Sequence, residues 1–225
     1  MNSGELLSLW RSKIVDTAKP YLWSDEEAWL YMNAAYKQFV RLTVGIADFT
    51  SDATKIDVIA GEATAEIHPS ILRVMDAYKS DGSELIVANI TDKDFMITSD
   101  YGFIRRLMMD ATPGPVRYMV IGAERGKVKW VQVPLTNDTV SLNVYRLPLV
   151  DVADENHPLD EVDELHHIAL MDWMSHLAYL KDDAETFDKT KSAEAAATFR
   201  TYCSQVKDEW ERYKHKNRTV AYGGI

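Results

Sequence analysis

The sequence predicts an α+β fold: a bundle of N- and C-terminal helices with a β-rich antiparallel insertion in the middle. Three observations indicate this fold class. Apolar side chains follow helical spacing in residues 1–47 and 151–211. They alternate with polar side chains through much of residues 48–150, as half-exposed antiparallel strands do. Helices that are confined to the two ends of a strand-rich chain are typical of α+β proteins, and we expect these ends to pack together.

Two helices are expected within residues 1–47. Ser3 can cap a first helix over residues 5–19, which a proline then ends. The second helix, over about 25–44, begins with a capping box: the Ser24 hydroxyl can accept a hydrogen bond from the backbone of Glu27, whose carboxylate reaches back to Ser24. An apolar stripe follows this box at helical spacing, so a helix is predicted there.

Short strands are expected throughout residues 48–150, where apolar and polar residues alternate. Asp81 and Gly82 form a typical hairpin turn between two of these strands. Residues 92–109 follow neither a helical nor a strand period clearly, although Asp100 could cap a short helix there. After a Pro-Gly-Pro break, three consecutive strands are predicted as an antiparallel meander; they cover residues 116–121, 127–133 and 139–145.

Residues 158–216 are expected to form two helices joined by a polar hinge at 181–188. The first of them, over about 160–180, is apolar on nearly all sides, and such a helix must be buried in a core or against other chains. Because only three other helices could cover it, we expect part of its surface to lie in a subunit interface. The residues expected in that interface are Trp173, Met174 and Leu177.

The chain therefore divides into four predicted segments: N-terminal helices (1–47), a β-rich insertion (48–150), C-terminal helices (151–211) and a flexible basic tail (212–225). Cations are favourable at a helix C-terminus, which explains part of the charge in this tail but not the residues beyond Arg218. A tail that contains aromatic residues can become ordered when it docks on a neighbouring protein. The binding residues expected in it are Arg212, Tyr213, Lys214, Lys216, Arg218 and Tyr222.

Composition excludes several classes of protein. The 225 residues, 46% hydrophobic and 27% charged, are enough for one globular domain with a large insertion. No run of apolar residues is long enough to predict a membrane span, and no signal peptide is expected. The net charge of −10 argues against nucleic-acid binding through the whole surface. The single cysteine, Cys203, excludes an intramolecular disulfide and is expected to be buried.

Few residues have catalytic or metal-binding potential. Glu164 and His167 match half of a carboxylate-bridged di-metal signature, but the sequence has no second pair of this kind. Acidic residues at a helix start explain this pair more simply. A metal-dependent enzyme that uses Glu164, His167 and His176 stays an alternative. Because nucleophile motifs and glycine-rich phosphate loops are absent from the sequence, we expect neither an enzyme nor a cofactor.

Several different short motifs follow one another along the sequence, and together they span nearly the whole chain. They are Trp23-Ser24-Asp25-Glu26-Glu27 with Tyr31, Asn33 and Ala35; Ile59-Ala60-Gly61 before Pro69-Ser70-Ile71-Leu72-Arg73-Val74; Tyr145-Arg146-Leu147-Pro148-Leu149; His157-Pro158-Leu159; and Ala178-Tyr179-Leu180-Lys181-Asp182-Asp183-Ala184-Glu185-Thr186-Phe187-Asp188 with Lys191, Ala195 and Phe199. Together they resemble the head–tail adaptor (connector) proteins of tailed bacteriophages.

The resemblance implies a virion structural protein that self-associates as a dodecameric ring under the portal protein. Such a ring links the capsid to tail or nozzle proteins in the neck of the virion, and genomic DNA passes through it during ejection without sequence recognition. The protein would be made in the host cytoplasm and would need no membrane. In this family the C-terminal segment commonly reaches along the portal, which corresponds to residues 212–225 here. A tail-completion or neck protein is the alternative role.

Overall fold

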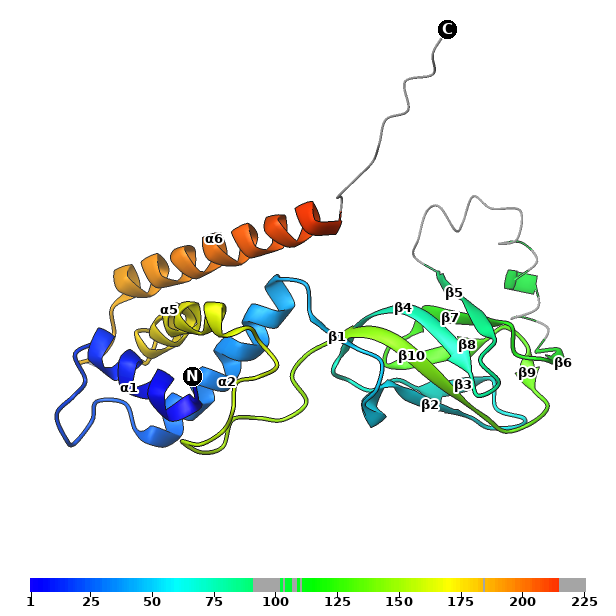
Figure 1. The fold of residues 1–225 in the computed structure, drawn as a ribbon, viewed down its shortest axis with the longest axis horizontal. Coiled ribbons are helices and arrows are strands. Elements are labelled where there is room, and N and C mark those ends of the chain that lie inside the picture. The colour runs from blue at the N-terminus through cyan, green and yellow to red at the C-terminus, as the bar shows by residue number, and fades with distance from the viewer. Residues whose placement is uncertain (91–101, 103, 107–108, 110, 184, 215–225) are drawn as a thin grey trace, which may run out of the picture. The chain divides into compact units, whose positions relative to one another are not determined.

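The computed structural model describes residues 1–90, 102, 104–106, 109, 111–183 and 185–214. The chain forms two compact units (Figure 1). The helical unit combines Met1–Gly45 with Pro148–Ile225, and the β unit comprises Ile46–Leu147. The chain thus leaves the helical unit once, forms the β unit, and returns to complete the first unit.

Four α-helices pack together in the helical unit: α1 (Ser3–Lys13), α2 (Asp25–Leu42), α5 (His167–Ala178) and α6 (Lys189–Lys214). Helix α5 contacts the other three helices, and a 3-10 turn, η2 (Glu164–His166), precedes it. The core contains Trp10 from α1, Met32 from α2, Met174 from α5 and Phe199 from α6, all fully buried. Burial of large apolar side chains from every helix is the main stabilising contribution to such a unit.

The capping box predicted at the start of α2 is present. The Ser24 Oγ accepts a hydrogen bond from the Glu27 backbone N–H at 3.2 Å, and the Glu27 carboxylate accepts one from the Ser24 N–H at 2.9 Å. A second capping box, which the sequence analysis missed, begins α1: the Asn2 side chain accepts from the Glu5 N–H. The predicted cap, Ser3, is instead the first helical residue, and its hydroxyl donates to the Asp154 carbonyl.

Two helix boundaries were predicted wrongly. Helix α1 ends at Lys13 rather than at residue 19, because Val15 adopts a left-handed backbone (φ 62°) and Asp16 then organises the following loop. Helix α5 begins at His167 rather than near residue 160. Pro158 forms a β-bridge with Asn2, and the Asp163 side chain caps η2, so the stretch before α5 is held outside the helix.

The β unit contains one eight-stranded sheet in the order β1-β10-β4-β5-β7-β8-β3, with β2 also paired to β10, and one two-stranded sheet of β6 and β9. The strands of the large sheet are β1 (Ile46–Asp48), β2 (Lys55–Val58), β3 (Thr64–Glu66), β4 (Ile71–Lys79), β5 (Glu84–Asn89), β7 (Tyr118–Glu124), β8 (Lys127–Trp130) and β10 (Asp138–Arg146). The small sheet pairs β6 (Pro113–Gly114) with β9 (Val133–Pro134), and a 3-10 turn, η1 (Asp52–Thr54), precedes β2.

The predicted fold class, a helical bundle with an antiparallel insertion, is wrong. The sheet is mixed, since β5 runs parallel to β7 and β6 runs parallel to β9, and it curls into a half-barrel (Figure 1). The predicted three-strand meander is also broken: β7 and β8 are neighbours, but β10 lies between β1 and β4. Alternation of residues shows which face of a strand is buried, but it does not say which strand lies beside it. Residues 92–109, which had no clear period, lie mainly outside the described residues.

The concave side of the curled sheet holds the core of the β unit. Val140, Leu142 and Val144 alternate along β10 and are fully buried, as their period predicted. The other members of this core come from β2, β4, β5, β7 and β8; they are Ile56, Val58, Ala77, Leu85, Met119, Val128 and Trp130. Strands from β2 and β10 across to β8 therefore share one core, which keeps the sheet curled.

A buried ion pair lies at the start of the β unit. Asp48, at the end of β1, accepts hydrogen bonds from the Arg146 guanidinium at 2.5 Å and from the Thr50 backbone N–H at 2.9 Å. Burial raises the pKa of this carboxyl, but the hydrogen bonds from Ser51, Arg146 and Thr50 outweigh that effect and hold the pKa well below its usual range. The charged form of Asp48 therefore stabilises the folded β unit.

Acid is expected to remove this contribution. Because the pKa of Asp48 is depressed in the folded state, its contribution is complete above the unfolded pKa of about 3.9 and is lost as the pH falls below that value. Between pH 5 and pH 2, the free energy of unfolding of the β unit should fall by about 2 kcal/mol more in the wild type than in Asp48→Asn. Urea unfolding followed by NMR signals of the β unit measures this difference. Equal pH dependence of the two proteins would contradict the assignment.

Candidate interaction surfaces

Helix α6 carries three of the six C-terminal residues that were predicted to bind a partner. Its inward residues follow a spacing of four and three: Ser192, Ala196, Phe199, Cys203, Val206 and Trp210. The first four of these are buried, whereas the last two are only half-buried. The stripe is thus packed firmly in its first half, and its exposure increases toward the basic end of the helix.

The predicted tail residues divide into two groups. Helix α6 continues through Lys214, so Arg212, Tyr213 and Lys214 are helical, and the Arg212 side chain is exposed. The prediction for Lys216, Arg218 and Tyr222 concerns residues outside the described part of the chain. The cationic end is therefore in part a continuation of a packed helix, which gives its first residues a defined direction.

The three predicted interface residues of α5 differ in exposure. Trp173 is half-buried, with its ring 5.1 Å from that of Phe199 and the Arg200 guanidinium 5.8 Å from its ring centroid. Leu177 is also half-buried. Met174 is fully buried among the helices of its own unit, because α1, α2 and α6 already cover that side of α5. Trp173 and Leu177 therefore reach the surface, and Met174 supports them from inside.

Other apolar side chains on the helical unit are more exposed than these. Leu30 on α2 is 68% exposed, and Ile168 on α5 is 60% exposed. Four further exposed apolar side chains lie in the two loops that follow α1 and α5; they are Val15, Leu22, Leu180 and Phe187. These two loops lie side by side, because the Lys181 ammonium reaches the Leu22 carbonyl and Glu27. We call this group the loop-end patch. The sequence analysis missed it because apolar residues in a loop have no period.

The residues of the metal-site alternative are engaged in the structure of the helical unit. The His167 Nε2 lies 2.8 Å from the carbonyl oxygens of Leu159 and Val162, so it donates to backbone. The Glu164 carboxylate accepts a hydrogen bond from the α-amino group of Met1, and the ammonium holds the pKa of Glu164 below its usual value. His176 contacts Ser192 on α6. Among the described residues, no three His, Cys, Asp or Glu side chains gather into a group that could hold a metal ion.

Cys203 is a structural residue. Its side chain is buried in the stripe of α6, and burial raises the pKa of its thiol to about 11. The thiolate, which is the nucleophilic form, is therefore scarce at neutral pH.

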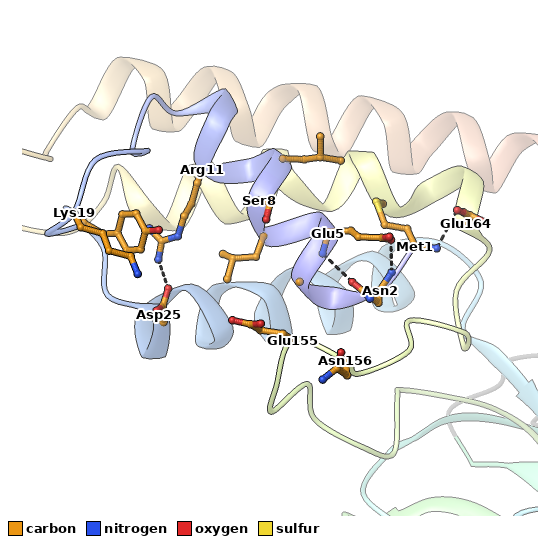
Figure 2. A pocket seen from close by; sticks show the side chains of 14 residues that line it. Met1, Asn2, Glu5, Ser8, Arg11, Lys19, Asp25, Glu155, Asn156 and Glu164 are labelled. Carbon is orange, nitrogen blue, oxygen red and sulfur yellow. Dashed lines mark hydrogen bonds and ion pairs between the residues drawn. The ribbon is translucent and has the colours of Figure 1, made fainter.

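A shallow groove of about 820 Å³ lies beside α1 in the helical unit (Figure 2). It is lined by charged, polar and apolar residues of α1, of the loop after it and of the loop before α5, and by Asp25 of α2. Figure 2 shows that these groups bind one another: Arg11 contacts Asp25, Glu5 contacts the backbone of Asn2, and the Met1 amine contacts Glu164. The groove is therefore a place where contacts of Arg11, Glu5 and the Met1 amine hold the N-terminal region against the rest of the unit.

Comparison with known proteins covers both units of the chain. The family model described as "SU10 adaptor protein" matches residues 1–220. No curated protein matches the chain. In the part of the chain that the structure describes, no helix combines the length and the apolar character that a membrane span requires.

Proposed function

The chain belongs to the SU10 adaptor protein family, and from this premise we propose that it forms a ring under the portal, joins the capsid to the tail, and lets DNA pass. Membership in this family implies that the protein is a structural adaptor of a bacteriophage and a component of the virion neck. The resemblance to head–tail adaptors that the sequence motifs indicated is thereby confirmed. The match over residues 1–220 carries the proposal, because it includes the helical unit and the β unit together.

Self-association is supported by apolar surface on the helical unit. Leu30, Ile168 and the four residues of the loop-end patch are exposed, large apolar side chains. A soluble monomer normally exposes few such side chains, and those few are scattered. In a dodecameric ring, neighbouring subunits would cover this apolar surface and would also cover Trp173 and Leu177. Trp173 is suited to such a contact because its large ring is already held by Phe199 and needs little ordering on binding.

The portal contact is proposed for the basic C-terminal end. Arg212, Tyr213 and Lys214 extend α6 beyond its packed half, and Lys216, Arg218 and Tyr222 follow in sequence. Each of these two groups of three residues contains two cationic side chains and one aromatic side chain. This combination suits binding to an acidic protein surface with apolar pockets. The remaining partners, tail or nozzle proteins, would contact surfaces of the ring that face away from the portal.

DNA passage is supported by charge. A chain with a net charge of −10 repels phosphates at long range, so a ring of such chains would not bind a DNA molecule that must move through it. The proposal therefore includes no sequence recognition and no stable DNA complex.

Co-sedimentation tests the proposed role against the tail-completion alternative. Purified chain is mixed with purified portal rings and, separately, with tails that lack heads, and each mixture is separated on a gradient. We expect the chain to sediment with portal rings. Sedimentation with tails but not with portal rings would contradict the proposal and support the alternative.

A further inference from the structure

Strand β4 has an open edge. On one side it pairs with β10 from Ile71 to Lys79, but on the other side it pairs with β5 only at Ala77 and Tyr78. Strand β5 then leaves β4 and pairs with β7 in parallel from Ile86 to Asn89. Among the described residues, no strand therefore pairs with the second edge of β4 over residues 71–76. An open edge exposes backbone N–H and C=O groups that can pair with another strand.

A groove of about 480 Å³ lies along this open edge, which we call the β4 groove. Its walls include residues 71–75 of β4, Val87 of β5, and residues 121–122 and 124–127 around the β7–β8 turn. Ile71, Val74, Val87 and Ile121 are half-buried against the core and form an apolar lining. In an extended peptide, alternate side chains point to the same side. Such a peptide could place every second side chain on this lining while its backbone pairs with β4.

The charges around the β4 groove favour an acidic ligand. Arg73 and Arg125 line it, are exposed, and form no ion pair with any described residue. Lys127 also lines it and lies 3.5 Å from Glu124, the single acidic residue in the lining. The lining thus carries three cations and one anion in a chain whose net charge is −10. A local excess of positive charge on an acidic protein attracts and orients acidic segments.

A protein segment fits this groove better than single-stranded nucleic acid does. Proteins that bind single strands without sequence preference stack the bases on aromatic side chains, and the lining of the β4 groove contains no Phe, Tyr, Trp or His. The strand edge, in contrast, offers backbone groups that only a peptide can match along its whole length.

We propose that the β4 groove binds an extended acidic segment of a partner protein, which adds to the sheet as a strand beside β4. Residues 71–76 give room for about six residues of such a strand at about 3.3 Å per residue. The segment alternates apolar residues, which face Ile71, Val74 and Val87, with acidic residues that reach Arg73 and Arg125. This site lies in the β unit and is separate from the portal contact proposed for α6, so either proposal can fail without the other.

The test uses the full-length chain and a blocked, fluorescein-labelled six-residue peptide in which valine alternates with glutamate. Binding is measured by fluorescence anisotropy. We expect saturable binding to the wild type and at least about tenfold weaker binding to Arg73→Glu/Arg125→Glu, because both cations that contact the ligand are reversed. The control Arg41→Glu/Arg117→Glu makes the same change in net charge at exposed residues outside the groove and should bind like the wild type.

Two further probes test strand addition itself. Two versions of the peptide carry N-methyl groups on alternate amides, one version in each phase. In one version the methylated amides face β4 and cannot donate to it, so this version should lose binding, whereas the other version should keep most of its binding. Amide exchange at residues 72–76 should slow when the unmodified peptide binds. Absence of binding to the wild type, equal binding of both methylated peptides, or equal loss in the control variant would overturn the proposal. Displacement of the peptide by an oligothymidine at the same concentration would overturn it in favour of a nucleic-acid site.

Discussion

Replacing Arg11 by methionine is expected to lower the free energy of unfolding of the helical unit by about 4 kcal/mol. Arg11 is 5% exposed, and its guanidinium lies 2.7 Å from Asp16 and 2.6 Å from Asp25. It also donates to the Trp23 carbonyl and stacks on the Tyr21 ring at 3.7 Å. Asp16 is itself 3% exposed, so removal of the arginine leaves a buried carboxylate without its cation. A methionine of similar length retains part of the packing, and the loss therefore reports mainly on charge.

The measurement is urea unfolding followed by tryptophan fluorescence, since Trp10 and Trp23 lie in this unit. Lys13→Met is the matched control on the same helix, because its ion pair with Asp172 is more exposed than the Arg11 cluster. Exposed pairs contribute about 0–1 kcal/mol, so this control should stay within about 1 kcal/mol of the wild type. Equal effects of the two substitutions would show that the Arg11 cluster does not hold the loop after α1 in place.

Deletion of residues 212–225 is expected to weaken binding to portal rings by at least about 100-fold, which corresponds to about 2.7 kcal/mol. The physical reason is that the proposed contact consists of this segment, while the helices that hold α6 lie before it. The deleted chain should keep its fold, because the buried part of the α6 stripe ends at Cys203. Sedimentation velocity with labelled chain measures binding, and circular dichroism checks that the helices are retained.

Charge and length can be separated in the same assay. The variant Arg212→Ala/Lys214→Ala/Lys216→Ala/Arg218→Ala keeps the full length and should also bind weakly. Lys189→Ala/Lys191→Ala removes cations from the opposite end of α6 and should bind as the wild type does. If the deleted chain binds portal rings with unchanged affinity, the portal contact lies elsewhere on the molecule.

Local features of the fold were predictable from the sequence. The α2 capping box depends on Ser24 and Glu27 alone, and the burial of Val140 and Leu142 follows from alternation within one strand. Both need only neighbours in the chain. The end of α1 was not predictable in this way. Asp16 contacts Arg11 and the Leu22 N–H across a loop, and these contacts, which the local sequence does not reveal, fix where the helix ends.

Sheet order and surface sites depend on contacts between distant segments, so alternation could not reveal them. The parallel pairing of β5 with β7 separates β5 from β4, and this separation opens the β4 groove. Nothing in the spacing of Arg73 and Arg125 indicates that they line one groove. Similarly, helical periodicity marked Met174 as apolar without showing that α1, α2 and α6 would cover it. The resemblance to the family, in contrast, could be predicted from the sequence, because it depends on many short motifs that follow one another in a fixed order.

Electron microscopy of portal rings incubated with the full-length chain tests the central claim most directly. The proposal predicts a closed ring of added density on the tail-facing side of the portal, with the helical unit of each subunit recognisable and its α6 end directed at the portal. Portal particles without added density, with the chain still monomeric in the same mixture, would contradict it.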